Sequence, residues 1–170
     1  MTNITHIAVG TVIAKVALSN NIIQADPLTV YAVAILFSNL PDFDLLLLGI
    51  RRSLALKLNH RIQSFMHFPL FWVVLYFVIG KWAPFHIHQT IKPYMQLTLI
   101  SLGLYFLLDM IGVHGGICWF GPFSKKQFSF TRLFTWPDTL RMFLLTYRKS
   151  NVFKMEILIW IGSLIYLFVF

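Results

Sequence analysis

Residues 62–80 form the longest uncharged run of the sequence, IQSFMHFPLFWVVLYFVIG, without a single Lys, Arg, Asp or Glu. A helix needs about 20 mostly apolar residues to cross the hydrocarbon core of a bilayer. Residues 94–113 form a second apolar run, which is interrupted by Asp109. Residues 28–50 form a third, which is interrupted by the Pro-Asp-Phe-Asp element at 41–44. These runs predict membrane-spanning helices.

The composition excludes an ordinary soluble domain. Of the 170 residues, 58% are hydrophobic and 12% are charged, whereas about a quarter of a soluble domain is charged. Two weaker runs, residues 4–18 with Lys15 and residues 157–170, are short for a full crossing, although the Lys15 ammonium can snorkel to the interface. The last run either spans or lies partly in the interface. We therefore predict an all-α, polytopic membrane bundle with four to five transmembrane helices.

Basic residues alternate between the loops. The loop between the first two runs has none, residues 51–61 have four, residues 81–93 have two, and seven follow the fourth run. Since Lys and Arg concentrate in cytoplasmic loops, the pattern predicts a cytoplasmic amino terminus, with residues 51–61 and 114–154 inside and residues 81–93 outside. The start of the chain lacks signal-peptide features, so we expect it to be retained.

Net charge and cysteine content limit the kinds of partner and metal site that the chain can have. The net charge of the chain is +8, and most of its basic residues lie in loops between apolar runs. This distribution favours anionic membrane lipids over nucleic acid as the partner. A single cysteine, Cys118, excludes an internal disulfide and a cysteine-based zinc cluster. We expect one integral membrane domain over residues 1–170, with a cytoplasmic interfacial segment at about 114–154 that includes a surface helix near 138–149.

Three of the six acidic residues, Asp42, Asp44 and Asp109, lie within or at the ends of apolar runs. A carboxylate at the bilayer centre costs about 2.5–3.5 kcal/mol on insertion scales, so three would cost at most on the order of 8–10 kcal/mol. That total is comparable with the stability of a whole domain, about 5–15 kcal/mol. Each carboxylate therefore needs a partner, which is either a basic side chain or a metal ion.

The predicted topology brings acids and imidazoles to one side of the membrane. We predict a metal site at the cytoplasmic face formed from these ligands: His6, Asp42, Asp44, His60, His67, Asp109 and His114. Three alternatives remain: a capped helix kink at 41–44, an interfacial pair at His60 and His67, and a salt bridge from Asp109 to Arg61 or another basic residue. His86 and His88 fall on the predicted outer side and are not expected to be ligands.

The order of these motifs resembles the YdjM-like family of bacterial inner-membrane proteins, described as membrane-bound metal-dependent hydrolases. The resemblance rests on Thr5-His6 with Gly10, Leu40-Pro-Asp-Phe-Asp44, His60-Arg61 with His67, Leu107-Leu-Asp109, Gly116-Ile117 and the 119–124 segment WFGPFS. The order of ligands is also distantly similar to that of bacterial zinc-dependent phospholipases C. The sequence departs from the family in having Tyr105 where a histidine is common, four residues before Asp109, and in placing His67 between Met66 and Phe68 rather than in Thr-His-Ser.

The resemblance implies a bacterial inner-membrane enzyme. The ligand types favour Zn, with Mn or Fe as alternatives, and a bound metal would supply hydroxide at neutral pH. We assign Arg61 and Asp44 as catalytic residues, with Arg61 gripping phosphate bidentately. A site at the membrane surface suits an amphiphilic phosphoester, such as a phospholipid or an isoprenoid phosphate. The alternative is a non-catalytic membrane protein that binds a partner, lipid or ion through the same polar cluster.

Overall fold

The computed structural model describes residues 3–43, 65–82, 84–111, 116–124, 126–130 and 147–169. Within these ranges the fold is all-helical apart from one isolated β-bridge, which confirms the predicted class. The α-helices are α1 (Asn3–Ser19), α2 (Pro27–Phe37), α5 (Pro69–Trp82), α6 (Phe85–Ile111) and α8 (Asn151–Val169). A short 3₁₀ helix, η1 (Phe65–His67), precedes α5.

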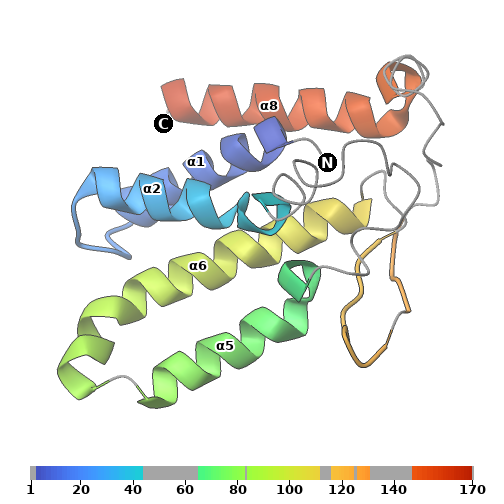
Figure 1. The fold of residues 1–170 in the computed structure, drawn as a ribbon. Coiled ribbons are helices and arrows are strands. Elements are labelled where there is room, and N and C mark those ends of the chain that lie inside the picture. The colour runs from blue at the N-terminus through green and yellow to red at the C-terminus, as the bar shows by residue number, and fades with distance from the viewer. Residues whose placement is uncertain are drawn as a thin grey trace.

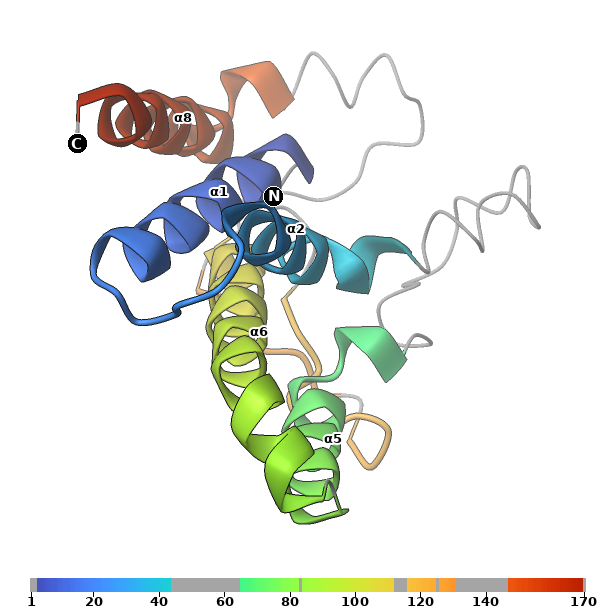
Figure 2. The same ribbon diagram turned by 90° about the vertical axis from the view of Figure 1, so that its left-hand side faces the viewer.

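Helices α1 and α6 form the centre of the bundle. Helix α1 packs against α2, α6 and α8, and α6 packs against α1, α2 and α5. Figure 1 shows α8 and α5 at opposite edges, and Figure 2 shows the same order from a second direction. The helices alternate in direction, so that α1, α5 and α8 begin at the end of the bundle where α2 and α6 finish (Figure 1).

Two of the helices are long and apolar enough to cross a bilayer. These are residues Thr90–Ile111 of α6, with a mean hydropathy of 1.5, and Asn151–Val169, with a mean hydropathy of 1.9. Helices α1, α2 and α5 are apolar but shorter, with 17, 11 and 14 residues. The described helices fit the expected membrane bundle, and two of them have the length and hydropathy of a full crossing.

The predicted span at residues 28–50 is interrupted in the structure. Helix α2 ends at Phe37, and helical backbone resumes at residues 40–43. Pro41 accounts for this break because it lacks an N–H and its ring clashes with the carbonyl four residues earlier, that of Phe37. The Asn39 side chain donates to the carbonyl of Ile35 at 2.9 Å and satisfies one of the last acceptors of α2.

The remaining predicted spans shift in their bounds. The run at 62–80 contains a break at Phe68, because Pro69 begins α5 at the position where a helix tolerates proline. Helix α6 begins nine residues before the predicted residue 94 and ends before Gly112. Helix α8 begins six residues before the predicted residue 157, where the Ser150 hydroxyl accepts from the Phe153 amide at 3.2 Å and caps the first turn.

Polar residues in the helices have specific partners. The Lys15 ammonium donates to the carbonyls of Leu167, at 2.6 Å, and Tyr166, at 3.4 Å. These carbonyls belong to the last turn of α8, where acceptors lack helical partners, so Lys15 caps the end of α8. The buried Glu156 accepts from the Tyr147 hydroxyl. Burial is the main cause that raises the pKa of Tyr147, and the hydrogen bond to Glu156 and the charge of Glu156 raise it further. The phenol of Tyr147 therefore stays protonated and donates.

Small residues bring α1 and α2 into close contact. Gly10, Ala14 and Ala17 recur on one buried face of α1, as expected for helices that pack inside membranes. A Cβ atom at Gly10 would lie 2.8 Å from Ser38 Oγ and 3.0 Å from the Ala34 carbonyl oxygen. Because the Ala34 oxygen belongs to the backbone of α2, it cannot move aside as the end of a flexible side chain would.

We therefore expect Gly10→Ala to destabilise the protein. Overpacking of this kind costs about 1–3 kcal/mol, which exceeds the gain of about 0.5–1 kcal/mol that alanine brings within a helix. Gly103→Ala in α6 is the matched control, because a Cβ there meets nothing within 4 Å. Free energies of unfolding in detergent test the pair, and equal effects of the two substitutions would contradict the packing account.

Candidate metal centre

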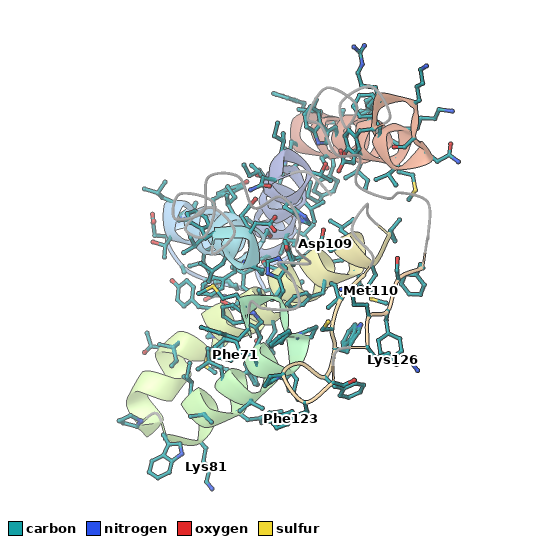
Figure 3. The ribbon with its side chains drawn as sticks, turned by 45° about the vertical axis from the view of Figure 1, so that its right-hand side comes forward. Phe71, Lys81, Asp109, Met110, Phe123 and Lys126 are labelled. Atoms are coloured by element: carbon teal, nitrogen blue, oxygen red, sulfur yellow. The ribbon has the colours of Figure 1, made fainter. Side chains whose placement is uncertain are left out.

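Four helix ends deliver acidic and imidazole side chains to the same end of the bundle. His6 lies in the first turn of α1, and Asp109 lies in the last turn of α6. Asp42 lies in the helical backbone that resumes after α2, and His67 ends η1 just before α5. All four side chains are buried, with His6 and Asp109 at 0% exposure. Figure 3 shows Asp109 at the end of α6, among the elements that carry the other three.

A tyrosine lies at the centre of this group. The Tyr105 hydroxyl donates to Asp42 Oδ1 at 2.8 Å and lies 3.1 Å from His67 Nε2, which is itself 3.3 Å from the same carboxylate oxygen. Tyr105 precedes Asp109 by four residues, so both side chains project from one face of α6. The Tyr105 ring also lies against the His6 ring, with 4.4 Å between the centroids. Tyr105 thus touches ligand candidates from three separate elements.

His6 is held in place without a strong hydrogen bond. Its Nε2 lies 3.5 Å from Asp109 Oδ1, at the outer limit of a polar contact. Neither ring nitrogen forms a hydrogen bond with the part of the chain that the structure describes. Burial of an unsatisfied imidazole is unfavourable. A metal ion beside Asp109 would give a His6 ring nitrogen a partner that the described residues do not supply.

The compact part of the site matches the donor set of a metal centre. One ligand atom from each of Asp42, His67 and Asp109 can be chosen so that all three lie within 4.8 Å of one another. Two ligands of one tetrahedral zinc ion, each held at about 2.0–2.2 Å, lie about 3.3–3.6 Å apart. Side-chain shifts of about 1 Å would therefore bring the three ligand atoms to one ion. His6 adjoins this group through Asp109.

A hairpin-like loop secures the end of α6 beside Asp109. Ile117 and Phe128 exchange two backbone hydrogen bonds, of 2.9 and 3.0 Å. The amide of Phe130 and the hydroxyl of Ser129 both donate to the carbonyl of Met110. Gly116 allows this turn because its φ of +97° favours glycine and a Cβ would collide with the carbonyl oxygen of Phe128 at 2.1 Å. The loop thereby satisfies an acceptor that the helix end leaves open.

The same loop covers the element that carries His67. A Cβ at Gly121 would meet the Phe68 ring at 2.3 Å, so only glycine permits this approach. The loop at 116–130 comprises turns and the β-bridge in its described parts. The glycines and the 119–124 segment of the motif therefore hold the site together from outside.

The structure brings together all of the predicted ligands that it describes, namely His6, Asp42, His67 and Asp109. The predictions for Asp44, His60, Arg61 and His114 fall outside the described residues. His67 belongs to a 3₁₀ helix rather than to a continuous membrane helix. Sequence reasoning missed Tyr105 as a member of the site. Its spacing of four residues from Asp109, at a position where the family commonly has histidine, was the available signal.

Comparison with known families supports the membrane assignment. A family model described as "YdjM inner membrane protein" matches residues 1–170, the whole length of the chain. No curated protein and no solved structure matches the chain.

The hydrogen bonds of Tyr105 make a testable prediction. Tyr105→Phe removes the donor to Asp42 Oδ1 and should lower the free energy of unfolding by about 1–3 kcal/mol, as expected when a buried acceptor loses its partner. Tyr94→Phe is the control, since it makes the same change on the same helix but in an apolar setting. Unfolding titrations in detergent measure both variants. Equal stability of the two would show that the Tyr105 hydroxyl does not hold the site together.

Proposed function

This chain belongs to the YdjM family of inner-membrane proteins, and we propose that it is a metal-dependent hydrolase whose centre is formed by Asp42, His67 and Asp109. The observation that carries the proposal is the convergence of two carboxylates and an imidazole, from three separate elements, in a buried site. Such a cluster of acids is too unfavourable in a bilayer to persist without compensation. The unsatisfied imidazole of His6 beside Asp109 supports the same conclusion.

Each side chain has a proposed role. Asp42, His67 and Asp109 would hold the ion, and His6 would either complete the set or orient Asp109. Zn is the preferred ion, with Mn or Fe as alternatives, because mixed carboxylate and imidazole donors suit these metals. The bound metal would lower the pKa of a water molecule and so supply hydroxide for attack on an ester. The Tyr105 hydroxyl already donates to Asp42, which fixes the orientation of that carboxylate.

Four further residues complete the proposed site from sequence alone. Asp44, His60 and His114 are proposed as additional ligands. Arg61 follows His60 and cannot bind a metal, because guanidinium only donates hydrogen bonds. Its planar fork suits a phosphate group, so we assign Arg61 and Asp44 to catalysis on an amphiphilic phosphoester.

We propose that the metal centre faces the cytoplasm and that the chain crosses the membrane four to five times. The alternating helix directions support this topology (Figure 1). Lys81 lies at the opposite end of the bundle from Asp109 and Lys126 (Figure 3), and the loop charges of the sequence predict that residues 51–61 and 114–154 are cytoplasmic. The segment at about 114–154 would lie on the inner surface.

In intact cells, a cysteine replacing Lys81 should react with an impermeant thiol reagent and one replacing Lys126 should not. The reverse result would invert the topology.

A second candidate function is a non-catalytic membrane protein that binds a partner, lipid or ion through the same cluster. The observation in its favour is that Tyr105, Asp42 and His67 already form a hydrogen-bonded network.

The effect of a chelator on the unfolding temperature distinguishes the metal-dependent hydrolase from the non-catalytic protein. Removal of a resident metal should lower the unfolding temperature, since a ligand that binds only the folded state stabilises it. A chelator should have no effect on a self-sufficient network.

Metal content tests the proposed centre directly. Substitution of His67 or Asp109 by Ala should lower the bound metal from about one ion per chain to a small fraction, because a lost ligand leaves the charge of the ion under-compensated. His88→Ala serves as the control and should leave the metal content unchanged. Elemental analysis of protein purified without chelator provides the measurement. A wild-type protein without metal would overturn the proposal.

Arg61 tests catalysis separately from metal binding. Arg61→Lys keeps the charge but loses the planar fork, so metal content should stay near normal while phosphate release falls ~100-fold, the effect of losing one preorganised donor. Arg61→Ala extends the comparison. A mild Arg61→Lys effect together with a poorly folded Arg61→Ala protein would instead identify Arg61 as the structural partner of a buried carboxylate.

A further inference from the structure

Helix α8 is attached to α1 by polar contacts at two points. The two helices pack against each other and lie side by side in both views (Figures 1 and 2). Near the start of α1, the indole Nε1 of Trp160 donates to the Thr5 hydroxyl at 3.1 Å. Near the end of α1, the Lys15 ammonium donates to the carbonyl of Leu167 at 2.6 Å. The first contact lies beside His6, and the second lies about 14 Å farther along the axis of α1, at 1.5 Å per residue.

The contact at Thr5 acts on the helical turn that carries His6. Thr5 and His6 are neighbours in the chain, and both side chains are fully buried. They lie in the first turn of α1, where backbone N–H groups lack helical partners and a helix frays most readily. Neither ring nitrogen of His6 is hydrogen-bonded to a residue that the structure describes. The position of the imidazole therefore depends on the contacts that hold this turn.

The membrane setting favours the bond between Trp160 and Thr5. Trp160 lies within α8, one of the two described helices that are long and apolar enough to cross a bilayer. An indole N–H in hydrocarbon has no water to bond, so it needs an acceptor from the protein. Thr5 supplies that acceptor, and its branching at Cβ leaves it few rotamers. A bond to its hydroxyl therefore also restrains the backbone of the first turn of α1.

A small rotation of this turn would separate His6 from the site. His6 Nε2 lies 3.5 Å from Asp109 Oδ1, and its ring centroid lies 4.4 Å from that of Tyr105. Both of these partners belong to α6, so the contacts form only while His6 faces that helix. The bond between Trp160 and Thr5 restrains the rotation of α1 about its own axis. It therefore restrains the direction in which the imidazole points.

We propose that Trp160 is a positioning residue for the metal centre, which by donating to Thr5 holds the first turn of α1 so that His6 Nε2 faces Asp109. The effect on metal binding rests on the proposed function, whereas the placement of His6 requires no metal. Trp160 contacts neither ion nor substrate and acts only through α1. Helix α8, which supplies none of the proposed ligands, thereby contributes to the centre.

Zinc affinity of the full chain in detergent, measured by competition with a chromophoric chelator, tests the proposal. Trp160→Phe keeps an aromatic ring but removes the donor, and it should weaken zinc binding about tenfold, within the range for residues that orient metal ligands. Lys15→Met is the matched control, because it removes the other polar contact between α1 and α8. It should leave the zinc affinity unchanged. Unchanged affinity in Trp160→Phe, or equal weakening in both variants, would overturn the proposal.

Variants of Thr5 test the same bond from the other helix, even if Trp160→Phe does not fold. Thr5→Ser keeps the hydroxyl and should retain the wild-type zinc affinity, whereas Thr5→Val loses it and should weaken binding about tenfold. The double variant of Trp160→Phe and Thr5→Val should bind zinc no more weakly than Thr5→Val alone, because both substitutions remove one bond. Additive losses would contradict a role through this bond.

A metal-free measurement distinguishes failure of this proposal from failure of the proposed function. In chelator-treated protein, the ring current of Tyr105 should displace the NMR signals of the His6 imidazole protons, which His6→Asn identifies. Trp160→Phe should return these signals toward their ordinary position, and Lys15→Met should not. Signals that stay in place in Trp160→Phe would overturn the proposal. A wild-type protein that binds no zinc but shows the expected signals would overturn the proposed function and leave the placement of His6 by Trp160 standing.

Discussion

The unfavourable burial of carboxylates in a membrane protein governs the rest of this structure. Asp42 and Asp109 are buried in an inner-membrane protein, and each would cost several kilocalories per mole in hydrocarbon without a partner. The fold places both at helix ends, next to imidazoles and a phenol from other elements. Polar groups from separate segments thus stabilise one another, and removal of one partner penalises those that remain.

The helix ends are arranged to serve this cluster. Pro41 ends α2 at Phe37, so the chain turns before Asp42, and Pro69 starts α5 directly after His67 and Phe68. Gly116 and Gly121 allow the loop at 116–130 to cap α6 at Met110 and to cover Phe68. The contact at Gly10 fixes α1, and with it His6, against α2. Residues that break or crowd helices are therefore also the residues that position the site.

Much of the architecture could be predicted from apolar runs and loop charge, because a bilayer imposes both. The exact helix ends could not be predicted. Pro41 accounts for the break at Ser38–Asn39, but the early start of α8 depends on a local hydrogen bond to Ser150. Likewise, loop charge placed His6, Asp42, His67 and Asp109 on one side of the membrane, but it carries no information about distances within that side. Tyr105 was missed because a tyrosine in an apolar run usually packs against other apolar residues. Its spacing from Asp109 was a signal, but the sequence did not show that three elements meet around its side chain.

The central claim is that one metal ion is bound by Asp42, His67 and Asp109. Anomalous diffraction from crystals of protein purified without chelator, recorded above and below the Zn, Fe and Mn edges, tests it most directly. We predict one anomalous peak for one of these metals, about 2.0–2.2 Å from the ligand atoms of all three side chains. A well-ordered site with no anomalous peak, in which the Tyr105 hydroxyl still bonds Asp42 and His67, would contradict the claim and identify a purely hydrogen-bonded cluster.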